Sequence, residues 1–511
     1  MSKRWTCLFL TLALIAGVLA VGAAAATAGI TEQERTAAID AGLAWLNAHQ
    51  TGTGYFEDPD HPGYWPVALT ALAVLKFEDD AARNDLSPFD AEYKYSPAVQ
   101  SAWQYLSKNA HVQKLTAQPA GNPDTNQNGI GVCFFSPGNN TCEVYETSAV
   151  MMALQASRKS GMVIPGGTGT FYDVLQDCVD WVAWAQTDGG TGEGGWYYRA
   201  MDNTSGTSDN SNSPWPVLGL MAAEAWGISP PPWVKSELQG HWLVATQQTN
   251  TMPKPGAFGY TTALNSTACG FFATTAAGMV ELSYCGVNST APQWLAGASA
   301  ICREWGTWNI GNLYAMYGLM KAAMLALPTP VWTFCEHEWQ PEYDRWLVDH
   351  QTKNGENAGS WPAHLAVPCI DGTGNAVLST EFALLVLQKA VPDRYDPLAS
   401  FEDLLRRQAE RLESFESLLK AAWDRLGREH QLEFLRSFED LLGSQAERLE
   451  SFEDLLSAAM GELDWLHQLT FLRSFEDLLR RQAQALASFE DLLKAYNAAV
   501  QPALQILIEE E

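Results

Sequence analysis

The sequence predicts an all-α protein with two parts. Residues 30–392 are expected to form an α6/α6 toroid of six helical hairpins, and residues 393–511 a helical or coiled-coil repeat region. Two observations predict this division. Apolar segments of two kinds alternate through the first part with a period of roughly 60 residues, and after residue 392 a 37-residue unit occurs three times.

Composition narrows the classes of function. The chain has 511 residues, a formal net charge of −28 and 47% hydrophobic residues, so it is long and apolar enough to bury a core. The excess of acids argues against nucleic acid and anionic lipid as partners, because both attract basic surfaces. The 20 tryptophans predict many aromatic contacts or a cavity lined by aromatic rings.

The first 28 residues have the order of a secretory signal peptide. Lys3 and Arg4 precede an apolar run over residues 8–21, and small residues follow up to Ala28, where cleavage is expected. A transmembrane anchor is the alternative, but the run is short for a bilayer core of ~30 Å. We therefore expect a secreted or cell-surface protein with no membrane span after signal removal.

The alternating segments of residues 30–392 predict an outer and an inner layer of helices. An amphipathic helix covers a core from outside, whereas a helix that is apolar on all sides must be buried. The amphipathic segments, expected outside, fall near residues 32–49, 97–110, 171–186, 233–248, 293–306 and 338–351. The apolar segments, expected inside, fall near residues 65–77, 146–157, 215–226, 268–283, 311–325 and 377–389. No segment shows sustained two-residue alternation, so no strands are expected.

Several outer segments end in a glutamine that is followed by a glycine and an aromatic residue. Glutamine can bond the free carbonyl groups at a helix end, glycine permits the turn, and the aromatic ring packs back on the helices. These turns are therefore predicted to join the hairpins. They are Gln50 with Gly54-Tyr55-Phe56, Gln186 with Gly195-Trp196, Gln248 with Gly256-Ala257-Phe258, and Gln351 with Gly359-Ser360-Trp361.

These turns, together with the inner segment over residues 146–154, resemble the prenyltransferase/squalene-cyclase repeat family, which includes terpenoid cyclases and protein prenyltransferases. The resemblance covers residues 30–392 and implies an α/α toroid. It implies no single activity, because such toroids include cyclases, protein prenyltransferases and non-catalytic ligand binders.

The catalytic motifs of that family are degraded or missing. Cyclases carry an Asp-x-Asp-Asp-Thr-Ala motif, and its closest match is residues 144–149. Glu146 stands at the position of the proton donor, but Val144 and Thr147 replace the supporting carboxylates that a strong acid needs. Prenyltransferases hold zinc with an Asp-x-Cys pair and a distant histidine, whereas Asp177 and Cys178 are adjacent here.

Aromatic residues and acids are expected to gather at the mouth of the ring. They suit a sugar or an apolar ligand, and the alternative is that the aromatic rings fill the core. Two carboxylates across a ring can hydrolyse a glycosidic bond, which makes Glu146 and Glu381 the candidate catalytic pair. The candidate ligand-binding residues are Trp65, Tyr145, Trp196, Tyr197, Trp215, Tyr314, Trp361 and His364.

One loop has the spacing of a calcium site. Asp124, Asn126 and Asn128 place oxygen atoms at alternate positions, with glycine sixth, as in a calcium-binding loop. The twelfth position is Phe135 instead of the usual glutamate, although Glu143 is near enough in sequence to replace it. An ordinary polar turn is the alternative reading. Beyond this calcium ion the cofactor requirement is open.

Eight cysteines follow the signal peptide, and an even number in an exported chain favours disulfides. Cys133–Cys142 and Cys269–Cys285 are the expected local pairs. A zinc site is the alternative, but the usual zinc-ligand spacings are absent from the sequence. Acceptor sites for N-glycosylation, compatible with a glycoprotein, occur at Asn139, Asn203, Asn265 and Asn288.

The repeat region has the pattern of a coiled coil. Leucines recur every seven residues, as at Leu398, Leu405 and Leu412, and phenylalanines recur at intervals of 14 and 23 residues. Joins of nine residues predict helix breaks near residues 428–433 and 466–470, which gives three long helices. A single rod of ~165 Å is the alternative. Either form suits self-association or tethering.

Together these features favour an exported binding or scaffolding protein. We expect a small-molecule or glycan ligand in the central cavity and a tail that assembles or tethers the ring. Two enzymatic alternatives stay open: a carbohydrate-active enzyme of the glycoside hydrolase or polysaccharide lyase type, and a degenerate terpene cyclase-like enzyme.

Overall fold

The computed structural model describes residues 30–391 apart from 59, 61, 64, 140, 201–205, 370–373 and 390. The predicted signal peptide (residues 1–28) and the repeat region (393–511) lie outside the described residues. In the part of the chain that is described, no helix has both the length and the apolar character needed to cross a bilayer.

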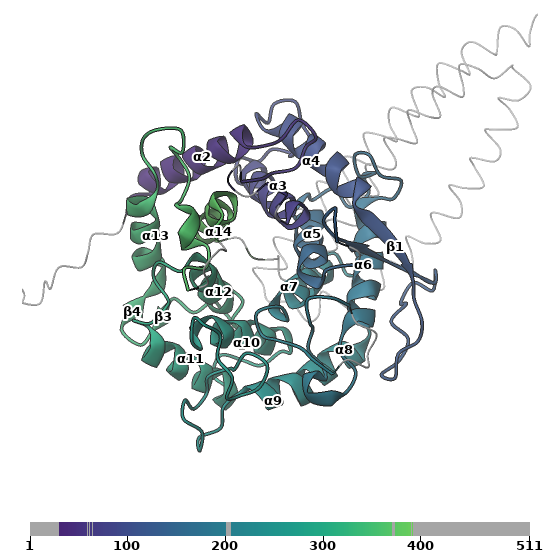
Figure 1. The fold of residues 1–511 in the computed structure, drawn as a ribbon, viewed down its shortest axis with the longest axis vertical. Coiled ribbons are helices and arrows are strands. Elements are labelled where there is room, and N and C mark those ends of the chain that lie inside the picture. The colour runs from purple at the N-terminus through teal and green to yellow at the C-terminus, as the bar shows by residue number, and fades with distance from the viewer. Residues whose placement is uncertain are drawn as a thin grey trace, which may run out of the picture. The chain divides into compact units, whose positions relative to one another are not determined.

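Paired helices close into a ring with an inner and an outer layer (Figure 1). The inner helices are α3 (Pro66–Arg83), α5 (Val144–Ala156), α7 (Pro214–Ala225), α10 (Phe272–Tyr284), α12 (Leu313–Met324) and α14 (Ala376–Gln388). The outer helices are α2 (Glu32–Ala48), α4 (Ser96–Lys108), α6 (Phe171–Ala185), α8 (Pro232–Glu237) with α9 (Leu243–Thr246), α11 (Pro292–Glu304) and α13 (Trp339–His350). The predicted α6/α6 toroid is confirmed, and with it the fold that the family resemblance implies.

The local sequence explains both layers. Every residue of α10 is buried, as expected of a helix that is apolar on all sides. The outer helices α2 and α6 each begin with a capping box, in which Thr31 pairs with Glu34 and Thr170 with Asp173. The apolar stripe of α2, which includes Leu43, is buried while its opposite face is exposed.

The glutamine turns join neighbouring hairpins as predicted. We call the loop between an outer helix and the next inner helix a joint, and the glutamine–glycine–aromatic turn within it a staple. In each staple the glutamine Nε2 donates to one carbonyl oxygen in its own loop and to another near the start of the next outer helix. The pairs of acceptors are Gly54 and Ala98 for Gln50, Gly194 and Val234 for Gln186, and Gly359 and Ala38 for Gln351.

The staple after α9 uses a different glutamine from the one expected. Gln247, and not Gln248, donates to the Gly256 and Gln293 oxygens. Gln248 instead accepts from the Lys254 N–H. A π-turn at Leu238–Trp242 takes up one extra residue in this outer segment, so the helix ends at Thr246 and its first following residue is Gln247.

The glycine and the aromatic residue of each staple have fixed roles. A Cβ on Gly54, Gly194, Gly256 or Gly359 would lie 2.1–2.4 Å from a carbonyl oxygen of the next outer helix, and each of these glycines has a positive φ. Two residues later comes the aromatic residue, whose ring is completely buried. Its backbone N–H donates to a serine or threonine hydroxyl that belongs to the inner helix or caps it. These pairs are Phe56 with Thr70, Trp196 with Ser213, Phe258 with Thr275, and Trp361 with Thr380.

The joint after α4 contains strands that the sequence did not predict. β1 (Ala110–Lys114) and β2 (Ile130–Phe134) pair in antiparallel register, and β2 packs against α6. Cys133 and Cys142 form the expected disulfide. Each strand has only five residues and lacks a clear alternation of exposed and buried positions, which explains why the pattern search missed both.

The joint after α11 also lacks a staple. A disulfide connects Cys302 of α11 to Cys335, which lies between the short strands β3 (Thr333–Phe334) and β4 (His337–Glu338). The Tyr343 hydroxyl of α13 donates to Asn309 in the joint. The Tyr343 hydrogen bond thus connects the joint to the next outer helix without a glutamine, and the disulfide connects the end of α11 to the segment just before α13.

One expected disulfide is wrong. Cys269, just before α10, pairs with Cys369 in the loop before α14, and Cys285 remains a thiol at the other end of α10. The helix between Cys269 and Cys285 has 13 residues, a length of ~20 Å that keeps the two sulfur atoms apart.

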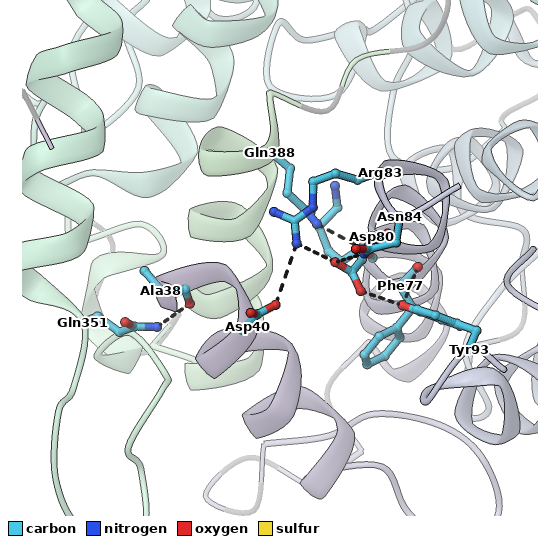
Figure 2. A network of polar contacts seen from close by, with 10 residues as sticks. Ala38, Asp40, Phe77, Asp80, Arg83, Asn84, Tyr93, Gln351 and Gln388 are labelled. Atoms are coloured by element: carbon cyan, nitrogen blue, oxygen red, sulfur yellow. Dashed lines mark hydrogen bonds and ion pairs between the residues drawn. The ribbon is translucent and has the colours of Figure 1, made fainter. Parts of the chain in front are cut away.

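The first and last hairpins close the ring through polar contacts (Figure 2). Within the first hairpin, Arg83 donates to Asp80 at 2.6 Å and lies 3.7 Å from Asp40 of α2. The Tyr93 hydroxyl donates to the Phe77 carbonyl oxygen at 2.7 Å. Two glutamines of the last hairpin reach the first: Gln351 bonds the Ala38 oxygen, and Gln388 the Lys76 oxygen.

Candidate functional site

The inner helices begin at one end of the ring, which we call the mouth. Contacts between their first residues connect neighbouring and distant hairpins. The Val67 N–H at the start of α3 donates to Ser136 beside α5. The Ala376 N–H at the start of α14 donates to Asp58 at 2.5 Å, and the Cys269–Cys369 disulfide connects the loops before α10 and α14.

Aromatic rings meet across the centre of the ring. The Trp215 ring of α7 lies 6.1 Å from Tyr317 of α12 and 6.5 Å from Phe382 of α14. α7 and α14 stand opposite one another in the order of inner helices (Figure 1). Trp215, Tyr317 and Phe382 are all buried and in contact across the ring. Their side chains therefore fill the central cavity expected from the sequence at this level. Trp215 and Tyr314, both predicted to line a ligand cavity, belong to this cluster.

A buried lysine completes the central cluster. Lys321 of α12 is 2% exposed, and its Nζ lies 4.1 Å from the centre of the Tyr317 ring and 5.0 Å from that of Trp215. Burial lowers the pKa of Lys321 to about 7. The amine is therefore partly neutral at physiological pH.

Glu146 lies in the first turn of α5 and is completely buried. The Ser136 N–H donates to its Oε2 at 2.8 Å, and the Ser136 hydroxyl donates to its Oε1. Burial raises the pKa of Glu146 to about 7, although the Ser136 hydrogen bonds act in the opposite direction. Glu146 thus holds Ser136 in place and can keep or lose a proton near neutral pH.

Glu381 and Glu146 interact with different residues of α3. Glu381 is the sixth residue of α14, it is completely buried, and neither carboxylate oxygen has a hydrogen-bond partner among the described residues. Burial raises its pKa well above the usual range, and the charge of Lys76 on α3 partly offsets this. Glu146 instead interacts with Ala68 of α3. Eight residues of helix separate Ala68 from Lys76, a distance of ~12 Å along α3.

Two of the predicted ligand-binding tryptophans serve the staples. Trp196 and Trp361 are completely buried, and their Nε1–H groups donate to the Val182 and Leu347 carbonyl oxygens of the outer helices, each at 2.9 Å. Trp65 is half-buried at the start of α3, with a left-handed backbone (φ 46°). His364 is exposed, in a short turn before α14.

Five tyrosines gather at the mouth around Ser211, and we call them the tyrosine patch. The Tyr198 hydroxyl lies 3.0 Å from the Ser211 Oγ and 3.4 Å from the Tyr260 hydroxyl. The Tyr314 hydroxyl donates to the Ser211 carbonyl oxygen at 2.9 Å. Tyr145, Tyr197 and Tyr314 are the predicted members, and the rings of Tyr145 and Tyr197 pack edge-on against Tyr198 at 6.3 and 5.3 Å. All five are at least partly exposed.

Acids support the patch from below and beside it. Asp209 is completely buried and accepts from the Ser211 N–H at 2.8 Å and the Ser211 hydroxyl at 2.6 Å, which fixes Ser211 among the tyrosines. Burial raises the pKa of Asp209, and the Ser211 bonds partly offset this. At the edge, Glu143 forms an ion pair with the exposed Arg199 at 3.3 Å.

Sequence analysis missed Tyr260, Ser211 and Asp209, although the repeat contains a signal for the first. Tyr198 and Tyr260 both lie two residues after the staple aromatic, Trp196 in one joint and Phe258 in the other. The equivalent position after Phe56 is Asp58, which bonds the start of α14. Aligning the joints on their aromatic residues would therefore have placed Tyr260 at the mouth.

The predicted calcium loop lies between β1 and β2 and faces α6. Asn126 and Asn128 contact Asp177 of α6, while Asp124 bonds the backbone of its own loop. Nowhere in the described residues do three His, Cys, Asp or Glu side chains form a metal site by themselves. A cation here would need amide oxygens in addition to carboxylates, and such a mixed set is what Ca²⁺ accepts.

A surface depression of about 410 Å³ lies outside the ring, between α2 and the loop after α13. Its lining includes Trp45, His49, Lys353 and Glu356. None of the predicted catalytic or ligand-binding residues contributes to it.

Comparisons with known proteins return distant similarities. No protein-family model matches the chain, and no curated protein matches it. Among solved structures the chain is similar to a GH76 α-mannanase from Bacteroides thetaiotaomicron (11% identity, TM-score 0.45, 73% of this chain and 97% of the other). It is also similar to the type II terpene cyclase MstE from Scytonema (14% identity, TM-score 0.40, 71% and 99%). At these values the likeness indicates no activity, and the toroid rests on the helix arrangement of this chain (Figure 1).

Proposed function

We propose that the ring is a carbohydrate-binding domain of an exported protein and that its ligand lies on the tyrosine patch. The observation that carries this proposal is the convergence of five partly exposed tyrosines from four separate segments of the chain around Ser211. Six tryptophans of the described residues, by contrast, are completely buried in the core: Trp103, Trp181, Trp196, Trp242, Trp339 and Trp361. The filled centre moves the expected ligand from the cavity to the mouth.

The chemistry of the patch supports a sugar ligand. A tyrosine offers an apolar ring face, on which the C–H face of a sugar can stack, and a hydroxyl that hydrogen-bonds sugar hydroxyl groups. The Tyr198, Tyr260 and Ser211 hydroxyls lie within 3.4 Å of their neighbours, so they present one continuous polar edge. Three disulfides among the described residues fit an oxidising, extracellular location.

Binding to insoluble polysaccharides tests this function. The full chain is incubated with mannan, xylan, cellulose and chitin, and the fraction bound is measured. We expect binding to at least one of them, with an affinity loss of about tenfold in Tyr198→Ala and in Tyr260→Ala. Trp332→Ala, which removes a 48% exposed ring far from Ser211 in sequence, is the matched control and should bind normally. Equal losses in all three variants would contradict the proposal.

A second candidate, glycoside hydrolysis, is favoured by one observation. The pKa of Glu146 is raised to about 7 by burial next to Tyr145, which suits a general acid. Release of reducing sugar by the wild-type chain that disappears in Glu146→Gln would support hydrolysis. Binding without any release would leave the binding function alone.

We also propose that residues 393–511 assemble or tether the ring. The recurrence of leucine every seven residues, as in a coiled coil, supports self-association. Sedimentation of the full chain and of a chain that ends at residue 392 tests this, because only the full chain should form an oligomer. Monomers in both samples would contradict it.

A further inference from the structure

The loop between β1 and β2 presents several oxygen-bearing side chains to one acid of α6. The amide groups of Asn126 and Asn128 both donate to Asp177 Oδ1, at 2.9 and 2.7 Å. Asp124 holds the loop closed, since its Oδ2 accepts from the Gly129 N–H at 2.8 Å. Four side chains from two segments, about 50 residues apart in sequence, therefore converge on a small volume.

A second acid of α6 is buried against the same loop without a complete set of partners. Asp180 is 0% exposed, and the Thr125 N–H and hydroxyl donate to its Oδ1 at 3.2 and 2.6 Å, so the carboxylate faces the loop. Its Oδ2 is buried and has no hydrogen-bond partner in the described part of the chain. A carboxylate oxygen left in this way is costly unless a cation or a donor reaches it.

Negative charge accumulates here without a counter-ion from the described part of the chain. No lysine or arginine among the described residues forms an ion pair with Asp124, Asp177 or Asp180. The Asp177 and Asp180 carboxylates are both buried, and both are repelled by the charge of Asp124. A bound cation would relieve the burial of charge and the repulsion together.

We propose that Asp124, Asn126, Asn128 and Asp177 bind a Ca²⁺ ion beside the buried Oδ2 of Asp180, which is unpartnered among the described residues. In the structure the amide nitrogens of Asn126 and Asn128 face Asp177. Ca²⁺ binding therefore requires both amide groups to turn their oxygens toward the ion. Carboxylate and amide oxygens suit a hard cation, and the proposed set has no histidine or cysteine ligand. The alternate spacing of the loop residues is the spacing of a calcium loop, and its missing twelfth acid is replaced from α6 instead of from Glu143.

The position of the site indicates its role. The joint after α4 has no glutamine staple, and β2 packs against α6 there. A Ca²⁺ ion shared by the loop and α6 would tie this joint to the next outer helix, which is what a glutamine does at four other joints. The site is thus a structural one that holds the ring closed.

Calorimetric titration of the full chain with CaCl₂, after dialysis against EDTA, tests the site. We expect saturable binding of one ion with a Kd of about 10⁻⁴ M or tighter and a higher unfolding temperature with Ca²⁺. Asp177→Asn should weaken binding at least about tenfold. Glu356→Gln, an exposed acid outside α6, is the matched control and should bind as the wild type does.

A gain-of-affinity variant keeps the test decisive if Asp177→Asn folds poorly. Asn128→Asp retains the Oδ1 that accepts from the Ile130 N–H and adds one negative charge, so it should bind Ca²⁺ at least about fivefold more tightly. Three results would overturn the proposal: no saturable binding up to about 10 mM CaCl₂, unchanged affinity in both loop and helix variants, or an equal response to MgCl₂.

Discussion

Four joints of the ring carry a glutamine staple, and two do not. In the stapled joints one glutamine bonds its own loop and the next outer helix, and a glycine allows the two to touch. In the joint after α4, a pair of short strands and the Cys133–Cys142 disulfide occur in place of the staple. In the joint after α11, Asn309 accepts from Tyr343 of α13, and a disulfide joins the end of α11 to Cys335 just before α13. Neighbouring hairpins are thus joined in two ways, by a glutamine turn at four joints and by strand pairing, a disulfide or a tyrosine hydrogen bond at the other two.

The stapled joints and the unstapled second joint make the same hydrogen bond to the inner helix, but they contact the next outer helix through different groups. Phe134 of the unstapled second joint is completely buried, and its N–H donates to Thr147 of α5 at 2.9 Å. Phe56 and Thr70 make the same contact in the first, stapled joint. The connection to the inner helix is therefore kept, and only the connection to the next outer helix differs.

Removal of disulfides should have the largest effect. Chain entropy predicts losses of about 4.7, 3.7 and 2.6 kcal/mol for loops of 100, 33 and 9 residues. Cys269→Ser/Cys369→Ser should therefore destabilise most, then Cys302→Ser/Cys335→Ser, then Cys133→Ser/Cys142→Ser. Urea unfolding under non-oxidising conditions measures the order. A reversed order would show that Cys133–Cys142 and Cys302–Cys335 stabilise the folded protein by more than their effect on the entropy of the unfolded chain.

Substitution of a staple glycine by alanine should have the second-largest effect on stability. Gly256→Ala places a Cβ 2.1 Å from the Ala296 carbonyl oxygen in a backbone with φ +82°, and we expect a loss of about 4 kcal/mol. Gly286→Ala is the matched control, because its φ is +81° but no atom lies within 4 Å of the added Cβ. Thermal unfolding should show a clearly smaller loss for the control. Equal losses would mean that backbone strain alone, and no close approach, explains the glycine.

The unstapled second joint should respond to pH. Ser136 of this joint is held by Glu146, whose pKa is raised from its ordinary 4.5 to about 7, so the folded protein keeps a proton that the unfolded chain loses. The contribution of Glu146 to the free energy of unfolding should therefore fall by about 3 kcal/mol as the pH rises from about 4.5 to 7. Glu146→Gln should remove that part of the slope in urea unfolding. A slope unchanged in the variant would contradict the assignment.

Loss of one staple glutamine should have the smallest effect. Gln351→Ala leaves the Ala38 and Gly359 oxygens without this donor at the ring closure (Figure 2), and we expect a loss of about 2 kcal/mol. Gln293→Ala, an exposed position, should change stability by no more than about 0.5 kcal/mol. A similar change in both variants would remove the distinction between stapled and unstapled joints.

Much of the scaffold could be read from the sequence. The helices begin and end within a few residues of their expected bounds, except that α3 extends to Arg83, because burial forces apolar residues to recur with the helical period. The staples were recognisable because their residues are close together in the chain. Sequence analysis misplaced Gln247 by one residue, since the π-turn that shifts it has no local signal.

The candidate sites were less predictable. Tyr145, Tyr197 and Tyr314 were placed at the mouth, but Tyr260, which meets Tyr198 there, comes from a different joint. Glu146 and Glu381 were paired because two carboxylates across a ring can hydrolyse a glycosidic bond. In the structure Glu146 interacts with Ala68 and Glu381 with Lys76 of α3, and the catalytic pair stays a prediction. The contribution of Asp177 to the loop at Asp124 depends on how β2 packs against α6, which no local pattern encodes.

By itself, then, the sequence determined the helices, their two layers and most of the staples, because each depends on residues within one or two turns of one another. Only the tertiary structure decided which cysteines pair, what fills the centre and which side chains meet at the mouth. Trp215 and Phe382 are 167 residues apart in sequence and come within 6.5 Å only because the ring closes. Contacts of that kind depend on the packing of all six hairpins, so no single segment of the chain contains them.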